Sequence, residues 1–204
     1  MTRFLKPFIL LICLFLFFQC SAPKEKEKET STDSLTQVFD RDFNKFFGHM
    51  NNEEWDKMMD MTNPQIFNIA PREALINMFK GQKGQGISMS INDIKINGYS
   101  DIMEFQGIYY TKISYEGTQR MELSEAIMSK IDLFKSELYK SYDKDDVKID
   151  LDNNVIQIDA TKQIIATSLD EKKSWKYLEI QEGQEQVMLK MLPVEVYDKL
   201  ITNE

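Results

Sequence analysis

Cysteine and histidine are almost missing from this sequence. The 204 residues contain two cysteines, Cys13 and Cys20, and a single histidine, His49. Both cysteines lie within the first twenty residues, so the rest of the chain has no disulfide, no thiolate metal site and no cysteine nucleophile. One histidine without a paired carboxylate spacing argues against a zinc centre and a serine hydrolase. The sequence therefore indicates no metal, no cofactor and no catalytic residue.

Long apolar runs are also missing, apart from one near the N-terminus. Residues 7–18 carry no charge, follow two cations and end at Gln19 and Cys20. A dozen residues are too few to cross a bilayer core, which needs about 20, but they are typical of the apolar region of a signal peptide. We interpret residues 1–19 as resembling a bacterial lipoprotein signal, with Cys20 as the lipidated residue. The alternatives are an ordinary signal-peptidase site, which would end at Ala22 just before Pro23, and an uncleaved anchor with an incidental cysteine.

Positive charge is in the minority. The formal net charge is -8, and removal of residues 1–19 takes away Arg3 and Lys6 and changes it to -10. Because an acidic domain repels phosphate backbones, we expect no nucleic-acid partner. Residues 20–33 include a strict alternation of lysine and glutamate, which predicts a solvated tether. Residues 34–204 then form a single domain.

The signal also predicts where the protein is found. A lipid on Cys20 makes the membrane a partner and places the domain in the bacterial cell envelope, in the periplasm or at the cell surface. Ser21 follows the cysteine, and by analogy with lipoprotein sorting it favours the outer membrane where the cell has one.

Apolar residues recur every three or four positions in the first part of the domain, which indicates helices. The predicted helices are residues 34–50, a segment capped by Asn51 or Asn52 and ended by Asn63-Pro64, and residues 71–80. Gly81 is expected to end the third helix. Residues 65–70, between the second and third helices, are predicted to be extended.

From Ile87 onward the apolar period changes to two, which indicates strands. The predicted elements are strands 87–96, 102–116, 147–151, 155–159, 163–168 and 175–180, a helix 124–142, and C-terminal helices 185–191 and 193–200. The apolar positions shift parity at Asn92-Asp93, which predicts a bulge. The predicted fold class is α+β, with N-terminal helices packed on a curved antiparallel sheet, an extra mid-chain helix and C-terminal helices.

The order of elements over residues 34–115 resembles the nuclear transport factor two superfamily. The features that carry this resemblance are the short link into Trp55, the Asn63-Pro64 break and the small helix before the long strands. The superfamily has a cone-shaped α+β fold that ketosteroid isomerases and polyketide cyclases share. The resemblance implies a sheet wrapped around a helix, with an apolar pocket at the open end. Because this fold also serves many proteins without catalysis, it does not assign a function.

The sequence offers two groups of residues for such a pocket. The candidate ligand-binding aromatics are Trp55, Phe105, Tyr109, Tyr115 and Trp175. At helix and strand periodicity such residues also form ordinary core. The candidate carboxylates for an isomerase base are Asp93, Asp101, Glu104 and Glu116, although turn and polar-face positions favour solvated acids. His49, at the end of the first helix, is interpreted as a capping or surface residue.

Three functions are compatible with these features. The first is a non-catalytic, lipid-anchored protein that binds a small apolar ligand or an envelope protein. The second is an isomerase- or cyclase-like enzyme that acts on a hydrophobic substrate in the cone pocket. The third is a structural or inhibitory interaction protein. An open pocket with a buried carboxylate would favour the enzyme, whereas a pocket filled by aromatic side chains, with a flat apolar patch outside, would favour the interaction protein.

Overall fold

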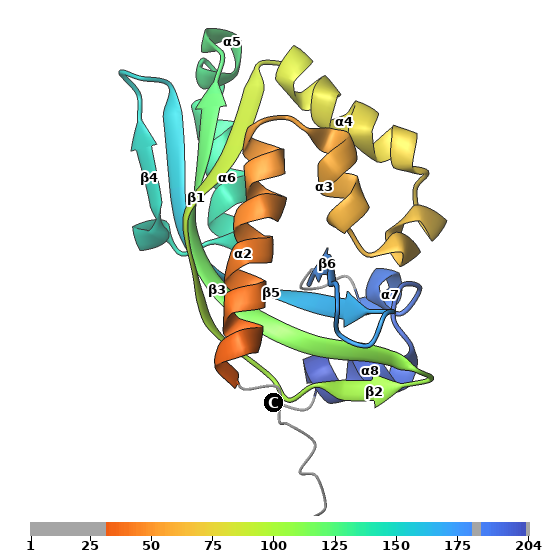
Figure 1. The fold of residues 1–204 in the computed structure, drawn as a ribbon. Helices are drawn as coiled ribbons and strands as arrows, with labels where there is room; N and C mark the ends of the chain where they lie inside the picture. Colours follow the sequence, from red (N-terminus) through yellow and green to blue (C-terminus); the bar gives the residue numbers. More distant parts are fainter. Residues whose placement is uncertain (1–31, 181–184, 203–204) are drawn as a thin grey trace, which may run out of the picture. The chain divides into compact units, whose positions relative to one another are not determined.

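The computed structural model describes residues 32–180 and 185–202 (Figure 1). The predicted signal peptide, Cys20 and the tether up to residue 31 lie outside the described residues. The fold described below is that of the unit Val38–Glu204, which begins inside the first described helix.

Helices form the first part of the fold, as predicted (Figure 1). They are α2 (Thr32–Asn51), α3 (Trp55–Met61), the 3-10 helix η1 (Pro64–Asn68) and α4 (Arg72–Gly84). Asn51 is the last residue of α2, and Glu54 precedes α3 without a side-chain cap, so the predicted asparagine cap of the second helix is wrong.

Two other local predictions fail at η1 and α4. Residues 65–70 are not extended, because the Asn63 side chain accepts a hydrogen bond from Gln65 N at 2.9 Å and Pro64 suits the first position of a helix. Gly81 does not end α4. The left-handed residue that a helix end favours is Gly86, at φ 87°, where an added Cβ would collide with the Ser124 side chain.

A six-stranded, antiparallel, curved and open sheet follows, so the predicted α+β class is confirmed (Figure 1). Its strands are β1 (Ile87–Tyr99), β2 (Met103–Phe105), β3 (Ile108–Leu123), β4 (Val147–Asp150), β5 (Val155–Ser168) and β6 (Lys176–Glu179). The order is β1-β3-β5-β4, with β2 pairing with β3 and β6 pairing with β5.

The predicted bulge in β1 is confirmed. The register against β3 shifts between Asn92 and Lys95, and Asp93 has a φ of 52°. On either side of the bulge, Met89 pairs with Met121 and Ile96 pairs with Tyr115. These β3 positions lie on the same face of the strand, so the bulge keeps the apolar residues of β1 on one side.

The predicted strand over residues 102–116 is instead a hairpin. Gln106 and Gly107 both have positive φ values, 54° and 78°, and Phe105 pairs with Ile108. Two left-handed residues between paired strands make a two-residue hairpin turn. The predicted break within residues 159–163 is also wrong, because β5 is one strand that pairs with β3 from Val155 to Ser168.

The predicted mid-chain helix is divided. It forms α5 (Glu125–Met128) and α6 (Ile131–Ser141), and the Ser129 hydroxyl donates to Ala126 O at 2.8 Å where α5 ends. A serine that bonds back to its own turn competes with helix continuation. Of the predicted C-terminal helices, 185–191 is shorter in the structure, as α7 (Glu185–Met188), whereas 193–200 is formed by α8 (Val194–Tyr197) and the π-helical turn η3 (Asp198–Thr202) that follows it.

The core beneath α2 is made of aromatic rings. The buried members are Phe39, Phe43, Phe47, Tyr115, Trp175 and Tyr177. Phe43 meets Tyr115 and Tyr177 edge to face, with ring centroids 5.3 Å and 5.2 Å apart. Such pairs add about 0.5–1.5 kcal/mol each beyond the burial of their area. The space between α2 and the sheet is therefore filled by side chains.

Candidate functional site

A cavity of about 170 Å³ lies at the C-terminal end of α2. Its walls come from the last residues of α2, the link to α3, the second half of α4, and strands β1 and β3. The volume is close to that of an engineered apolar cavity of about 150 Å³ that binds benzene. It is below the roughly 300–1,000 Å³ of pockets that enclose drug-sized ligands. One side chain or one small ring fits this space.

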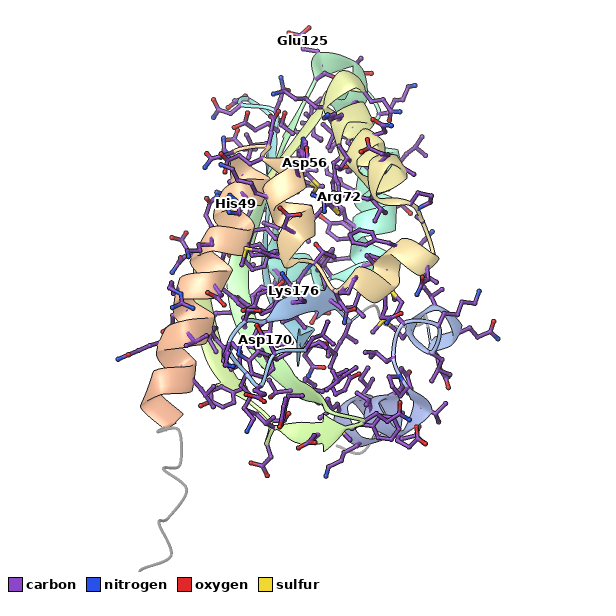
Figure 2. The ribbon with its side chains drawn as sticks, turned by 45° about the vertical axis from the view of Figure 1, so that its right-hand side comes forward. His49, Asp56, Arg72, Glu125, Asp170 and Lys176 are labelled. Atoms are coloured by element: carbon purple, nitrogen blue, oxygen red, sulfur yellow. The ribbon has the colours of Figure 1, made fainter. Side chains whose placement is uncertain are left out.

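Two stacked aromatic rings form the apolar wall. The rings of Trp55 and Phe79 lie 5.0 Å apart at an interplanar angle of 8°. They come from α3 and α4, which Arg72 holds together through ion pairs with Asp60 at 2.8 Å and with Asp56 at 3.4 Å (Figure 2). Of the five aromatics predicted for ligand binding, Trp55 is the one that lines this cavity.

The link between α2 and α3 contains a strained residue. Glu53 lines the cavity at a φ of 58°, the left-handed region that costs a non-glycine residue about 1 kcal/mol or more. Its backbone N–H donates to Met50 O at 3.0 Å, and its carboxylate pairs with Lys83 of α4. Strained backbone that the surroundings hold in place is enriched at binding sites.

His49 is tied to the same link. Its Nδ1 lies 2.6 Å from Glu54 Oε2, and Lys57 Nζ lies 2.6 Å from Glu54 Oε1. The hydrogen bonds from Lys57 and from His49 lower the pKa of the Glu54 carboxyl. His49, which Figure 2 labels near the end of α2, is half-buried, and its side chain bonds to the Glu54 carboxylate and not to the last carbonyls of the helix.

The charges in the cavity wall are paired. Lys83 pairs with Glu53, and Arg120 pairs with Glu122 at 3.2 Å. Each pair joins one cation to one carboxylate, so the lining is balanced in charge. Together with the rings of Trp55 and Phe79, this balance favours an uncharged occupant that packs against those rings.

The outer edge of β1 borders the cavity, and one point of that edge is already occupied. Asn51 Nδ2 donates to Ile91 O at 2.8 Å, and Ile91 N donates to Asn51 Oδ1 at 2.9 Å. A side-chain amide thus takes both hydrogen bonds that a neighbouring strand would supply.

The other predicted ligand-binding aromatics lie elsewhere. Tyr115 and Trp175 are buried beneath α2. Phe105 packs against the cluster under the C-terminal helices. Tyr109 lies under Lys172, whose Nζ is 4.7 Å from the ring centroid, and the charge of Glu104 is the main cause that raises the pKa of its phenol. The structure does not bring the five residues together, and their role in ligand binding stays a prediction.

The predicted carboxylates are also dispersed. Asp93, Asp101 and Glu104 are exposed. Glu116 pairs with Lys95 at 2.9 Å, and that hydrogen bond lowers the pKa of the Glu116 carboxyl. None of the four lines the cavity described above.

Among the residues that the structure describes, the buried carboxylate is that of Asp42, which the sequence reasoning missed. Asp42 is 8% exposed, and Arg41 Nη2 lies 2.9 Å from its Oδ1. The pKa of the Tyr177 phenol is raised, first by burial and then by the charge of Asp42. The Tyr177 hydroxyl is buried and makes no hydrogen bond of normal geometry among the described residues. The position of Asp42 between Phe39 and Phe43, on the apolar face of α2, was the available signal.

Two features are absent from the described residues, a metal site and a membrane-spanning helix. Across residues 32–180 and 185–202, no group of three histidine, cysteine, aspartate or glutamate side chains is placed to hold a metal ion. Across the same residues, no helix has the length and apolar character needed to cross a bilayer.

Comparisons with known proteins add no assignment: no family model matches the chain, and no curated protein matches it.

Proposed function

We propose that this protein is a non-catalytic binding protein of the bacterial cell envelope, anchored by a lipid on Cys20. Its partner is another protein, which inserts one apolar side chain into the cavity between α3, α4 and β1. The observation that carries this proposal is the size of the cavity, about 170 Å³, beside the Trp55–Phe79 stack. Interfaces between proteins often depend on one or two side chains that fill such a pocket.

The filled interior beneath α2 also supports this proposal over an isomerase or cyclase. Such an enzyme needs its carboxylate to face an open apolar pocket. The Asp42 carboxylate is buried, but the interior beneath α2 is filled by aromatic rings such as those of Phe43 and Tyr177. The filled interior also agrees with a structural or inhibitory interaction protein, the third function that the sequence left open.

The anchor is tested by the intact mass of the full-length protein isolated from its native membrane. A diacylated or triacylated N-terminus at Cys20 is expected, and the mass increment should be absent from Cys20→Ser. A chain that begins at Met1, or an unmodified chain cut after Ala22, would contradict the anchor.

The site is tested by photo-crosslinking in intact cells. A photoreactive residue at Gln82, which lines the cavity, is expected to form a defined adduct with one protein, identified by mass spectrometry. The same residue at Gln106, in the exposed hairpin turn, is the matched control. The adduct should disappear in Trp55→Ala. Absence of an adduct at Gln82, or an adduct that Trp55→Ala leaves unchanged, would overturn the binding role.

A further inference from the structure

We propose that the partner binds as an extended segment that adds a strand to the outer edge of β1, at Ile87 and Met89. This inference rests on the proposed function and names the partner's chemistry. The segment is a short stretch of extended backbone with an uncharged apolar side chain at its centre.

The hydrogen-bond pattern of β1 establishes which backbone groups point outward. In an antiparallel pair, successive residues bond alternately to the neighbouring strand and to the opposite side. Ser124 N donates to Gly86 O at 2.8 Å, so Gly86 points toward the β3 side. Ile91 points away from β3, because both of its backbone groups bond to Asn51.

These two observations agree. Backbone groups alternate in direction along a strand, so two residues an odd number of positions apart, such as Gly86 and Ile91, point in opposite directions. No register shift occurs before Asn92. The N–H and C=O groups of Ile87 and Met89 therefore point outward, in the same direction as those of Ile91. Among the described residues, β3 is the one strand that pairs with β1, so the outward backbone groups of Ile87 and Met89 have no strand partner and face the cavity between β1, the α2–α3 link and α4.

Asn51 both indicates the kind of partner and limits its length. The amide group of a side chain has the donor and the acceptor of a peptide group, and at Ile91 it bonds as a peptide would. Because Asn51 occupies Ile91, an added strand ends opposite Met89. At the other side, the chain turns into α4 before Gly86. The pairing thus covers about three partner residues, opposite Ile87, Ser88 and Met89.

The cavity specifies the central partner residue. Ser88 pairs with Glu122 and Ser90 with Arg120, so these four side chains share one face of the sheet. All four line the cavity, as do Ile87 and Met89 on the other face. A partner residue opposite Ser88 places its side chain on that same face. It enters a space of about 170 Å³ whose charges are already paired. A leucine- or phenylalanine-sized side chain fits, and a charged one would be left without a partner.

The test begins with a displayed library of random octapeptides, selected on the full chain and counter-selected on Trp55→Ala. The strongest peptide is then made with blocked termini, together with analogues that carry one backbone N-methyl group each. Backbone NMR of the full chain should show the largest shifts at Ile87 and Met89. N-methylation of a residue opposite either of them should weaken binding at least about tenfold, because it removes a hydrogen bond and blocks close approach.

Asn51→Ala provides a gain-of-function test. Removal of the amide frees the backbone of Ile91, so the peptide should bind more tightly and should also slow amide exchange at Ile91; absence of both effects would contradict pairing along this edge. Asn92→Ala, a nearby exposed asparagine whose amide contacts Ser90 instead of an edge backbone group, is the matched control and should change neither property.

The outcomes separate the two proposals. Failure to select any peptide, equal binding of the N-methyl analogues, or shifts that avoid Ile87 and Met89 would overturn strand addition. If the Gln82 crosslink and its dependence on Trp55 persist in that case, the binding role stands with a different mode of docking. If the crosslink is also absent, the proposed function itself fails.

Discussion

Asn51 and Ile91 are joined by two hydrogen bonds, of 2.8 Å and 2.9 Å, between a side-chain amide and a strand backbone 40 residues away. The pair connects the end of α2 to the edge of β1. It also protects one position of that edge, because an unpaired strand edge can recruit another chain. The open stretch next to it borders the cavity.

Asn51→Ala should expose the Ile91 amide. The loss of one hydrogen bond, worth about 1 kcal/mol, should speed amide exchange at Ile91 by about fivefold. Hydrogen exchange measured by NMR checks this, with Asn92→Ala as the control. Unchanged exchange at Ile91 would show that the amide is protected by another group.

The Trp55–Phe79 stack should contribute measurably to the packing of α3 on α4. Phe79→Leu keeps an apolar side chain but removes the stacked ring, so the free energy of unfolding should fall by about 1 kcal/mol. The fluorescence of Trp55 should shift toward that of a solvated indole, while the buried Trp175 is unaffected. Met78→Ala, at a position of α4 that is 50% exposed, should change stability by less than about 0.5 kcal/mol.

Removal of the Tyr115 hydroxyl should stabilise the protein. That oxygen is buried and has no hydrogen-bond partner among the described residues. A buried unpaired hydroxyl costs about 1–3 kcal/mol, so Tyr115→Phe should raise the free energy of unfolding by about 1 kcal/mol in urea denaturation. Tyr110→Phe is the control, because its ring is also buried but its hydroxyl is not one of the buried unpaired groups. A loss of stability in Tyr115→Phe would reveal a buried water or ligand at this oxygen.

Asp170 should make the loop after β5 sensitive to acid. Hydrogen bonds from Ser174, and then from Ser168, lower the pKa of the Asp170 carboxyl to about 2, below its ordinary value of 3.8. A lowered pKa means that the ionised form stabilises the fold. This contribution is complete above the unfolded pKa and is lost as the pH falls from about 4 to about 2.

Thermal unfolding of Asp170→Asn across this range checks the prediction. The variant should be less stable than the native protein near pH 7, and the two should converge near pH 2. Asp101→Asn, at an exposed turn, is the control and should follow the native curve. A constant difference between Asp170→Asn and the native protein would mean that the carboxylate charge is not responsible.

Several elements follow from local sequence pattern alone. The three- and four-residue spacing that includes Phe39, Phe43 and Phe47 predicts α2, because one face of a helix must be buried. The parity shift at Asn92-Asp93 predicts the bulge, because a strand has two faces and its apolar side chains must stay on one of them. The α+β class follows from the change of period at Ile87.

Other features depend on residues that are distant in the sequence. The polar stretch near Thr161 was predicted to interrupt the strand. It is part of β5 because its backbone pairs with β3, where Thr161 lies opposite Glu116. The sequence predicts Asn51 as a helix cap, but in the structure its side chain bonds to the backbone of Ile91. In each case a long-range hydrogen bond outweighs local preference, which amounts to less than about 1 kcal/mol per residue.

The sequence by itself determined the class of the fold, the bulge, the acidic charge and the absence of cysteine chemistry from the domain. Only the tertiary structure decided that the interior beneath α2 is filled, that Trp55 meets Phe79, and that their cavity lies against the edge of β1. The physical reason is that composition and periodicity are properties of neighbours along the chain. A cavity exists only where separate elements meet without filling the space between them.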